Sequence, residues 1–280
     1  MKSLTPEKIA ELEEVARQLR VDSLRLIHRR GAGHPGGSLS AAEIMAVLYF
    51  HWLQIDPARP DWAARDRFIL SKGHASALLY SALSRRGYFP SQELDNWGEV
   101  ECRHQGHPDR LKTPGVDMTS GILGHGVAVG AGLALAARLK KLSYRSYVLL
   151  GDGECQGGIV WEGAVTAAKY RLSNLTAILD NNDVQLDGPI HAVMPLEPIA
   201  DKWKACGWHI IEVNGHSVWE LSQALELAGE IHDRPTLVLA HTTKGKGVSF
   251  MENQSYWHGN VPDAGQLAQA MLELGEVRHA

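Results

Sequence analysis

Two polar clusters in the middle of the chain combine residue types that suit a cation and a phosphate. The first reads Gly151-Asp152-Gly153 and the second reads Asp180-Asn181-Asn182. A carboxylate and an amide carbonyl are oxygen ligands of the kind that hard cations prefer. Glycines beside the acid let the backbone approach a phosphate closely, and the N–H groups that open a following helix can bind it. We therefore expect a magnesium-bound diphosphate at Asp152 and Asn182.

The segments around these clusters predict how they are brought together. Each cluster follows an apolar run, at 147–150 and at 175–179, and a helical stretch lies between the two. A strand, a helix and a second parallel strand form a βαβ unit, whose strand ends share one edge of a sheet. Ligands of open α/β sheets bind at that edge. Either cluster alone is more often a turn or a helix cap, but their joint occurrence favours the diphosphate site.

Four histidines in glycine-containing loops are candidate substrate contacts, namely His34, His74, His107 and His258. His34 lies in Gly31-Ala-Gly-His-Pro-Gly36, which matches a dinucleotide fingerprint, but that fingerprint must follow a strand and this one follows a basic helix. A glycine turn that ends the helix is the simpler alternative. His74 follows a predicted strand, beside Lys72, which is available for phosphate charge.

The other two histidines and a lysine have their own alternatives. His104 and His107 are three residues apart, so zinc is a minor alternative, although no third ligand at zinc spacing follows. Lys244 stands in Thr242-Thr-Lys-Gly-Lys-Gly247 after another apolar run, where it can neutralise diphosphate charge or lie in a flexible basic turn.

Composition limits the possible classes of protein. The chain has 280 residues, of which 44% are hydrophobic, and its net charge is −4 without long blocks of either sign. Nothing in this pattern indicates a nucleic acid or a membrane as a partner. No apolar run approaches the roughly 20 residues of a membrane span or the core of a signal peptide. Three scattered cysteines indicate neither a disulfide framework nor zinc, so we expect a cytoplasmic protein.

The apolar periodicity predicts an α/β fold with a mostly parallel sheet. We expect strands near 67–71, 147–150, 175–180, 208–213 and 236–241, alternating with helices. We expect one domain over residues 1–280, with an N-terminal helix over 6–29 that bends near Val21. Ser40 and Glu43 have the spacing of a capping box. A helix rich in glycine and alanine, ending near Lys140, has small residues that suit close packing inside the chain or against another chain.

The motifs together resemble the transketolase family. The resemblance is carried by Gly-Asp-Gly with the later Asn-Asn, by Gly-His-Pro-Gly around His34, by Ser-Lys-Gly-His-Ala around His74, by Gly-His-Pro-Asp around His107 and by Trp-His-Gly around His258. It covers nearly all of these residues but only the first portion of an ordinary transketolase. The resemblance implies a three-layer α/β/α fold, the thiamine-diphosphate-binding fold of the PP type. It also implies thiamine diphosphate and Mg²⁺ as cofactors, with Ca²⁺ or Mn²⁺ as possible substitutes for the metal.

The resemblance also implies a role for each candidate residue. The metal would be held by Asp152, Asn182 and the carbonyl of Val184. The cofactor would be bound by His74, Gly121, Ile122, Leu123, Gly151, Asp152, Gly153, Glu154, Asn182, Lys244 and His258. The four histidines would line the substrate channel as catalytic residues. His125 stands where most relatives carry glutamine, which brings a titratable group near the cofactor ring.

No glutamate with an aromatic platform, which the family supplies from a second, pyrimidine-binding domain, is evident in this chain. We therefore expect one subunit of a split transketolase, nearly inactive by itself, with the other half on a partner chain in an α2β2 assembly. The reaction would move a two-carbon ketol unit from a ketose or ketose phosphate to an aldose. The alternatives are half of another thiamine-diphosphate enzyme, of the 2-oxo acid dehydrogenase or deoxyxylulose-phosphate synthase type, and a non-catalytic subunit that binds the cofactor.

Overall fold

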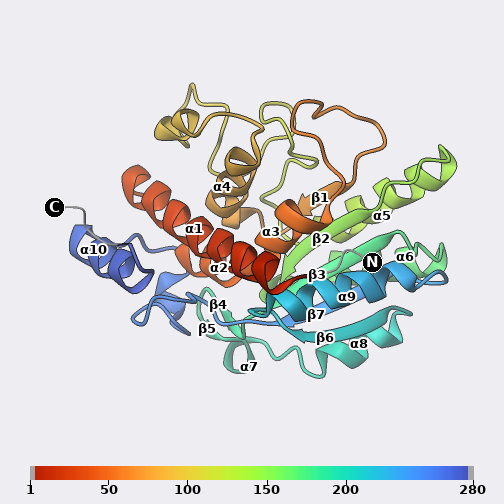
Figure 1. The fold of residues 1–280 in the computed structure, drawn as a ribbon. Helices are drawn as coiled ribbons and strands as arrows, with labels where there is room; N and C mark the ends of the chain where they lie inside the picture. The colour runs from red at the N-terminus through yellow and green to blue at the C-terminus, as the bar shows by residue number, and fades with distance from the viewer. Residues whose placement is uncertain (1–3, 277–280) are drawn as a thin grey trace.

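A parallel sheet of five strands forms the centre of the molecule (Figure 1). The computed structural model describes residues 4–276. The strands lie in the order β1-β2-β3-β7-β6. They are β1 (Arg67–Leu70), β2 (Ser146–Gly151), β3 (Leu175–Asn181), β6 (His209–Asn214) and β7 (Thr236–His241). All five predicted strands are therefore confirmed, with ends that differ from the prediction by at most one residue.

Helices cover both faces of this sheet, and the helix ends predicted at 29 and near Lys140 each lie within one residue of the observed ends of α1 and α5. The longer helices are α1 (Pro6–Arg30), α4 (Ser76–Arg86), α5 (His125–Leu139), α6 (Gly158–Lys169), α8 (Ile199–Ala205), α9 (Val218–Glu230) and α10 (Ala264–Glu273). The shorter ones are α2 (Pro35–Ser40), α3 (Ala42–Val47), the π-helix η1 (Leu48–Trp52), η2 (Gly73–Ala75), η3 (Ser91–Asn96), η4 (Gly153–Gln156), α7 (Ile190–Val193) and η5 (Ser255–His258).

Alternate residues of each strand face opposite layers, which is why the strands read as continuous apolar runs. In β2, Tyr147 and Leu149 pack with α1, α3, α4 and α9 on one face. Val148 and Leu150 pack with α5, α6 and α8 on the other face. This three-layer arrangement confirms the predicted α/β fold with a mostly parallel sheet.

The helix α1 runs unbroken through the predicted bend near Val21. Thr5 caps its start by accepting a hydrogen bond from the Lys8 N–H, and Gly31, with a φ of 67°, ends it in the left-handed conformation that glycine tolerates. Of the apolar residues that recur at helical spacing, Leu12, Leu19 and Leu24 are fully buried, whereas Ile9 and Val15 are half-buried. The loop that carries His34 therefore begins at a fixed helix end.

The capping box predicted at Ser40 and Glu43 is wrong. Ser40 ends α2, and α3 begins after Ala41 without a side-chain cap. The Ser40 hydroxyl donates to Asp180 at 2.6 Å, while Glu43 pairs with Arg20 at 2.6 Å. Both side chains satisfy buried partners far along the chain, so tertiary contacts override the local capping pattern.

The order of strands in the sheet departs from their order along the chain after β3, and this determines where the candidate site lies. From β1 to β3 each new strand lies beside the last, whereas β6 forms the far edge and β7 fills the gap between β3 and β6. A reversal of this kind leaves a crevice at the carboxyl ends of the strands. A short antiparallel pair that the sequence pattern did not predict, β4 (Val184–Gln185) with β5 (Gly188–Pro189), follows β3 there.

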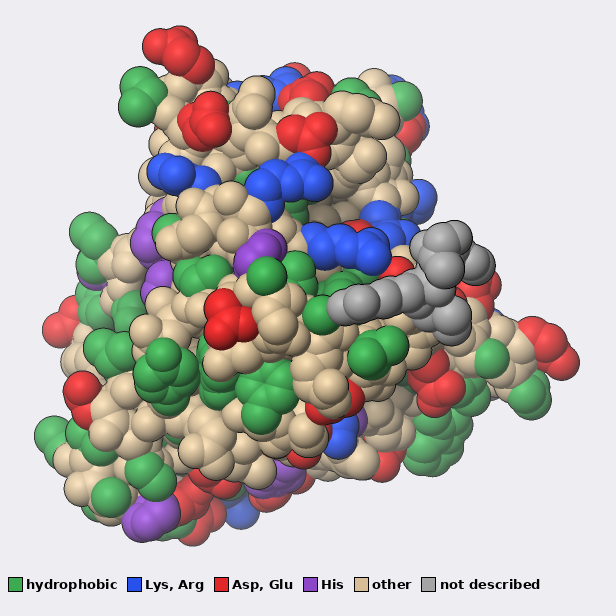
Figure 2. All heavy atoms as spheres, turned by 90° about the vertical axis from the view of Figure 1, so that its left-hand side faces the viewer, with side chains coloured by type: hydrophobic (Ala, Val, Ile, Leu, Met, Phe, Trp, Pro, Cys, Tyr) green, Lys and Arg blue, Asp and Glu red, His purple; other side chains and the backbone are tan. Residues whose placement is uncertain are grey.

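No helix within residues 4–276 has the length and hydropathy needed to cross a membrane. On the face shown in Figure 2, Lys and Arg side chains gather in a band across the middle. This is the side toward which the C-terminal half of α1 points in Figure 1, and that half carries Arg25, Arg29 and Arg30.

Candidate functional site

The carboxyl ends of β2 and β3 bring Asp152 and Asn182 into one buried cluster. Gly151 pairs in register with Asp180, so the residues that follow the two strands are neighbours. The Asp152 carboxylate is 4% exposed and accepts hydrogen bonds from the N–H of Gly153 at 2.7 Å and of Asp183 at 2.6 Å. The Asn182 amide oxygen accepts a hydrogen bond from the Val184 N–H at 3.3 Å.

The electrostatics of Asp152 fit a site that receives a cation. Burial, with the nearby charge of Asp180 as the next cause, raises the pKa of this carboxyl to about 7, against the two N–H donors and the Lys244 charge that lower it. A bound cation reverses that balance and keeps such a carboxylate ionised. The oxygens of Asp152, Asn182 and Val184 are hard ligands of the kind Mg²⁺ takes. The residues therefore fit the implied metal.

Lys244, which follows β7, connects this cluster to the histidines. Its side chain is buried, and its ammonium donates to the Val184 carbonyl oxygen at 2.8 Å and to His258 Nδ1 at 2.8 Å. Burial lowers the pKa of Lys244 to about 8, with Lys72 as the next cause. The lysine thus contacts a predicted metal ligand and a predicted substrate contact at once.

The four predicted histidines come together although they are far apart in sequence. The His34 ring centroid lies 5.1 Å from that of His74, 6.4 Å from that of His107 and 5.5 Å from that of His258. The rings of His74 and His258 are 5.1 Å apart. They surround His34 from three different loops, as expected for side chains that line one channel.

Three of these histidines are held neutral by their surroundings. Burial lowers the pKa of His34, with the charges of His107 and Lys244 as further causes. It lowers the pKa of His74 well below the usual value, and it lowers the pKa of His258 to about 3, in both cases with lysine charges adding to the effect. Since Lys244 donates to Nδ1 of His258, the proton of that neutral ring lies on Nε2, which can donate to a ligand.

The loop with Gly121, Ile122 and Leu123 lies beside His107 and exposes two apolar side chains. Gly121 has a φ of 144°, and a Cβ there would lie 3.4 Å from the His107 ring. Ile122 is 75% exposed and Leu123 is 45% exposed. The neighbouring Ser120 Oγ is buried and has no hydrogen-bond partner among the described residues. Apolar side chains and an unsatisfied hydroxyl fit the ring of an organic cofactor.

Glu154 has a side-chain role that its sequence motif did not reveal. Its carboxylate is 4% exposed and accepts hydrogen bonds from the N–H of Gly124 at 2.6 Å, from the N–H of Gly151 at 3.1 Å and from the Ser71 hydroxyl. It therefore fixes the 121–124 loop to the ends of β1 and β2. Only its backbone N–H was expected to matter, because the side chain's partners lie in distant segments.

The prediction that Lys72 is available for phosphate charge is wrong. Lys72 is 1% exposed, forms an ion pair with Asp180 and donates to the Gly37 carbonyl oxygen at 2.8 Å. The Lys72 charge is neutralised by the buried Asp180 carboxylate, so it is not available to a ligand. The sequence pattern did not reveal Asp180 as the partner of Lys72, because the two residues are 108 positions apart along the chain.

Two further histidines lie outside this group. His104 is fully buried, with its ring packed on Phe89 and 3.1 Å from a Glu93 carboxylate oxygen. Within residues 4–276 no three His, Cys, Asp or Glu side chains gather as a metal-ligand set. His125 is exposed at the start of α5, with Nδ1 3.2 Å from the Leu123 carbonyl oxygen.

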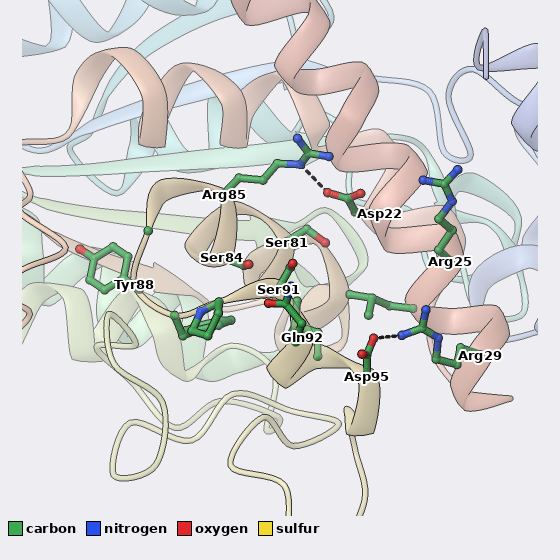
Figure 3. Close-up of a pocket in the computed structure, with 15 residues that line it drawn as sticks. Asp22, Arg25, Arg29, Ser81, Ser84, Arg85, Tyr88, Ser91, Gln92 and Asp95 are labelled. Atoms are coloured by element: carbon green, nitrogen blue, oxygen red, sulfur yellow. Dashed lines mark hydrogen bonds and ion pairs between the residues drawn. The ribbon is translucent and has the colours of Figure 1, made fainter. Parts of the chain in front are cut away.

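A large cavity, of about 950 Å³, does not contain the candidate site. It lies between α1, α4 and the segment that includes η3 (Figure 3). Two of its arginines are paired, Arg85 with Asp22 and Arg29 with Asp95. None of the candidate site residues lines it, so its size does not make it the catalytic centre.

Comparisons with known proteins agree with the geometry. Residues 11–278 match the family described as the thiamine diphosphate binding domain of transketolase. The transketolase of Campylobacter jejuni has the same fold, with a TM-score of 0.92 and 34% identity, and the match covers 97% of this chain and 44% of that one. Fold, site and family thus define a thiamine-diphosphate-binding protein.

Two curated relatives match over nearly their whole length. One is an apulose-4-phosphate transketolase subunit of Phocaeicola vulgatus, 38% identical over 96% of this chain and 95% of the relative. The other is a 6-deoxy-6-sulfo-D-fructose transketolase subunit of a Clostridium species, 42% identical over 90% of this chain and 92% of the relative. The chain belongs to the transketolase family. The expectation of a transketolase that is one subunit of a split enzyme is confirmed.

Proposed function

We propose that this subunit transfers a two-carbon ketol unit from a ketose or ketose phosphate to an aldose, in an α2β2 assembly with a partner that carries the pyrimidine-binding domain. The match to relatives that are themselves named as subunits supports a partner chain. The exposed Ile122 and Leu123 support a site that a second chain covers, since apolar side chains grouped at a site favour contact with a partner. Residues 1–280 then act as one domain.

Thiamine diphosphate, held through Mg²⁺, is the cofactor in this proposal. Asp152, Asn182 and the Val184 carbonyl would hold the metal, and Ca²⁺ or Mn²⁺ would be substitutes. The backbone around Gly151, Gly153 and Glu154 would bind the diphosphate, together with Lys244, His74 and His258. Gly121, Ile122 and Leu123 would contact the ring. When bound, the cofactor supplies the chemistry of breaking and forming the carbon–carbon bond.

The histidines of this chain would bind and orient the substrates. His34 and His74 would meet the sugar oxygens as neutral imidazoles, able to donate at one nitrogen and accept at the other, and His107 would contact the same oxygens. The Nε2–H of His258 would donate to an oxygen of cofactor or substrate, because Nδ1 is engaged by Lys244. Neutral rings cost less to desolvate than imidazolium ions, which suits a buried channel.

One observation supports the proposal above the others. The buried Asp152 carboxylate, the Asn182 amide and the Val184 carbonyl lie at one sheet end, and Lys244 joins that end to the histidine group. This combination provides a cation site and a hydrogen-bonding channel in contact with each other. Three free cysteines, with no disulfide among the described residues, support a cytoplasmic location.

Reconstitution tests the proposal. The chain is mixed with a candidate partner subunit that carries a pyrimidine-binding domain, and ketol transfer from a ketose donor is compared with turnover of a 2-oxo acid. Ketol transfer by the mixture, with little by either chain alone, is the expected result. Turnover of the 2-oxo acid alone would instead favour another thiamine-dependent class, and cofactor binding without turnover would favour a non-catalytic subunit.

Removing one metal ligand tests the cofactor assignment. Asp152→Ala should abolish thiamine diphosphate binding by the reconstituted enzyme, because the carboxylate that would hold Mg²⁺ for the diphosphate is lost. Calorimetry with Mg²⁺ measures this, and Asp187→Ala, an exposed acid in the same region, is the control. Unchanged affinity in the Asp152 variant would refute the metal assignment.

A further inference from the structure

The buried carboxylate of Asp180, next to the candidate metal ligand Asn182, joins four segments that carry or adjoin site residues. Asp180 is fully buried at the end of β3. It accepts hydrogen bonds from Ser40 Oγ at 2.6 Å, from Asn182 Nδ2 at 3.3 Å, and from Lys72 Nζ and Thr242 Oγ1. The donors come from α2 and from the loops after β1, β3 and β7.

Two of these donors stand within the loops that carry candidate site residues, and a third, Asn182, is itself a candidate metal ligand. Lys72 precedes His74 by two residues, and Thr242 precedes Lys244 by two. Lys72 also donates to the Gly37 carbonyl oxygen at 2.8 Å, which reaches the segment that follows His34. The network therefore fixes the positions of the histidine and lysine loops relative to the end of β3.

The chemistry of Asp180 also determines which way the Asn182 amide faces. An ionised carboxylate only accepts hydrogen bonds, so it can bind the NH₂ group of the amide but not its oxygen. Both Asp180 oxygens act as acceptors in the structure: Oδ2 accepts from Ser40, Lys72 and Asn182, and Oδ1 accepts from Thr242. The amide oxygen of Asn182 must then point away from Asp180, where a cation can use it.

We propose that Asp180, which is paired with Lys72, is a positioning residue that orients the Asn182 amide oxygen toward the metal. The inference rests on the proposed function, because it assumes a cation at Asp152 and Asn182. Partners that orient metal ligands typically contribute about 10–100-fold to metal affinity. Asp180 thus acts through Asn182 without touching the metal.

The test measures metal binding by the full chain and does not depend on turnover. Mn²⁺ is titrated in the presence of inorganic pyrophosphate, and free Mn²⁺ is followed by electron paramagnetic resonance. The double variant Asp180→Asn/Lys72→Met removes both charges, so no unpaired buried charge remains. We expect Mn²⁺ affinity about 10–100-fold weaker than in the wild type, with thermal unfolding still cooperative.

A matched control separates positioning from general stability. Arg65 and Asp117 form another buried ion pair, 2.7 Å apart. The variant Arg65→Met/Asp117→Asn should shift the unfolding temperature but leave Mn²⁺ affinity within error of the wild type. An equal loss of affinity in the control would show that any loosened core weakens the site, and would overturn the inference.

A double-mutant cycle tests whether Asp180 acts through Asn182. If it does, the Asp180 change should add little further loss of Mn²⁺ affinity once Asn182→Ala is present. Additive losses, or wild-type affinity in the Asp180 variant, would overturn the inference.

If Asp180→Asn/Lys72→Met does not fold, a second variant serves. Ser40→Ala/Thr242→Val removes two donors without altering charge and should weaken Mn²⁺ binding severalfold. Failure of the wild-type chain itself to bind Mn²⁺ would refute the metal assignment and, with it, this inference.

Discussion

At the scale of single residues, the site depends on polar side chains that are buried and hydrogen-bonded. Asp152, Asn182 and Lys244 are each less than a tenth exposed, yet every one has hydrogen-bond partners. Buried polar groups of this kind are costly unless they are paired. Their exact neighbours therefore decide both stability and ligand binding.

His258 gives a prediction at this scale. His258→Ala should lower kcat and raise KM for the ketose donor by about 10-fold or more, because the reconstituted enzyme loses an oriented N–H donor. Steady-state kinetics measure both constants. The control is His241→Ala, since His241 is exposed and its side chain's polar partner among the described residues is Glu212, at 3.1 Å. Constants equal to the wild type in the His258 variant would remove this residue from the site.

The residue types of the site could be read from the sequence, but their partners could not. Asp152, Asn182 and the four histidines lie where the strand-end argument and the motifs placed them. Lys72 was misjudged, because a lysine in a loop is normally solvated and only the fold brings it to Asp180. The side-chain contacts of Ser40, Glu154 and Thr242 were missed for the same reason, since their partners lie in segments distant along the chain.

At the scale of elements, close packing of α5 on the sheet explains its small residues. Gly130 is buried, and a Cβ there would lie 2.5 Å from Val148 Cγ2 and 3.2 Å from Leu175 Cδ1. The sequence left open whether these residues face another chain or the interior. The structure shows that Gly126 and Gly130 face the sheet of their own chain.

Two glycines of α5 offer a matched pair of predictions. Gly130→Ala should destabilise the chain by about 1–3 kcal/mol, because Val148 is stiff and cannot move aside. In the same helix, a Cβ at Gly132 would meet no atom within 4 Å. Gly132→Ala should therefore stabilise the chain by up to about 1 kcal/mol through helix propensity. Urea denaturation measures both. Equal effects at the two positions would contradict the packing explanation.

A buried charge cluster joins α1, α3 and the loop before α9. Glu43 accepts a hydrogen bond from Arg20 at 2.6 Å and lies 3.0 Å from His216 Nδ1. Burial raises the pKa of Glu43, but the hydrogen bond from His216 and the charge of Arg20 outweigh it and lower the pKa from 4.5 to about 2. A lowered pKa in the folded state means that folding favours the ionised carboxylate.

This cluster predicts a loss of stability in acid. The contribution of Glu43 is complete above about pH 5 and is lost as the pH falls through 4.5 toward 2, on the order of 3 kcal/mol in all. Urea denaturation at several pH values measures the free energy of unfolding. Glu43→Gln should be less stable near neutrality and should show a smaller change across that pH range. If the free energy of unfolding changed equally with pH in the wild type and in Glu43→Gln, Glu43 would be ruled out as the source of the change.

The elements themselves were largely predictable, because five apolar strands and amphipathic helices leave strong periodic patterns. The capping box at Ser40 was wrong because Asp180 and Gly37 compete for the hydroxyl. The β4–β5 pair was missed because two-residue strands carry no periodicity. The order of β7 and β6 in the sheet could not be derived either, since apolar patterns contain only the order of strands along the chain.

At the scale of the whole molecule, the chain covers 44% of the Campylobacter jejuni transketolase, whereas it spans nearly all of the two curated transketolase subunits it resembles. The proposed α2β2 assembly requires that the chain combine with its partner in equal numbers in solution. Sedimentation equilibrium of the mixture measures the mass, and ketol transfer should saturate at one partner per chain. Saturation at another ratio, or a mass that fits only one copy of each, would contradict the α2β2 assembly.

The Asp180 network also bears on engineering new substrate preferences. Loops that share one acceptor cannot be exchanged one at a time, because a replacement that moves Gly37, Lys72 or Thr242 alters the anchor of the others. Variation is best confined to the parts of the loops that carry the histidines, with Gly37, Lys72 and Thr242 kept unchanged. A library built on that division should retain more folded members than one that randomises whole loops.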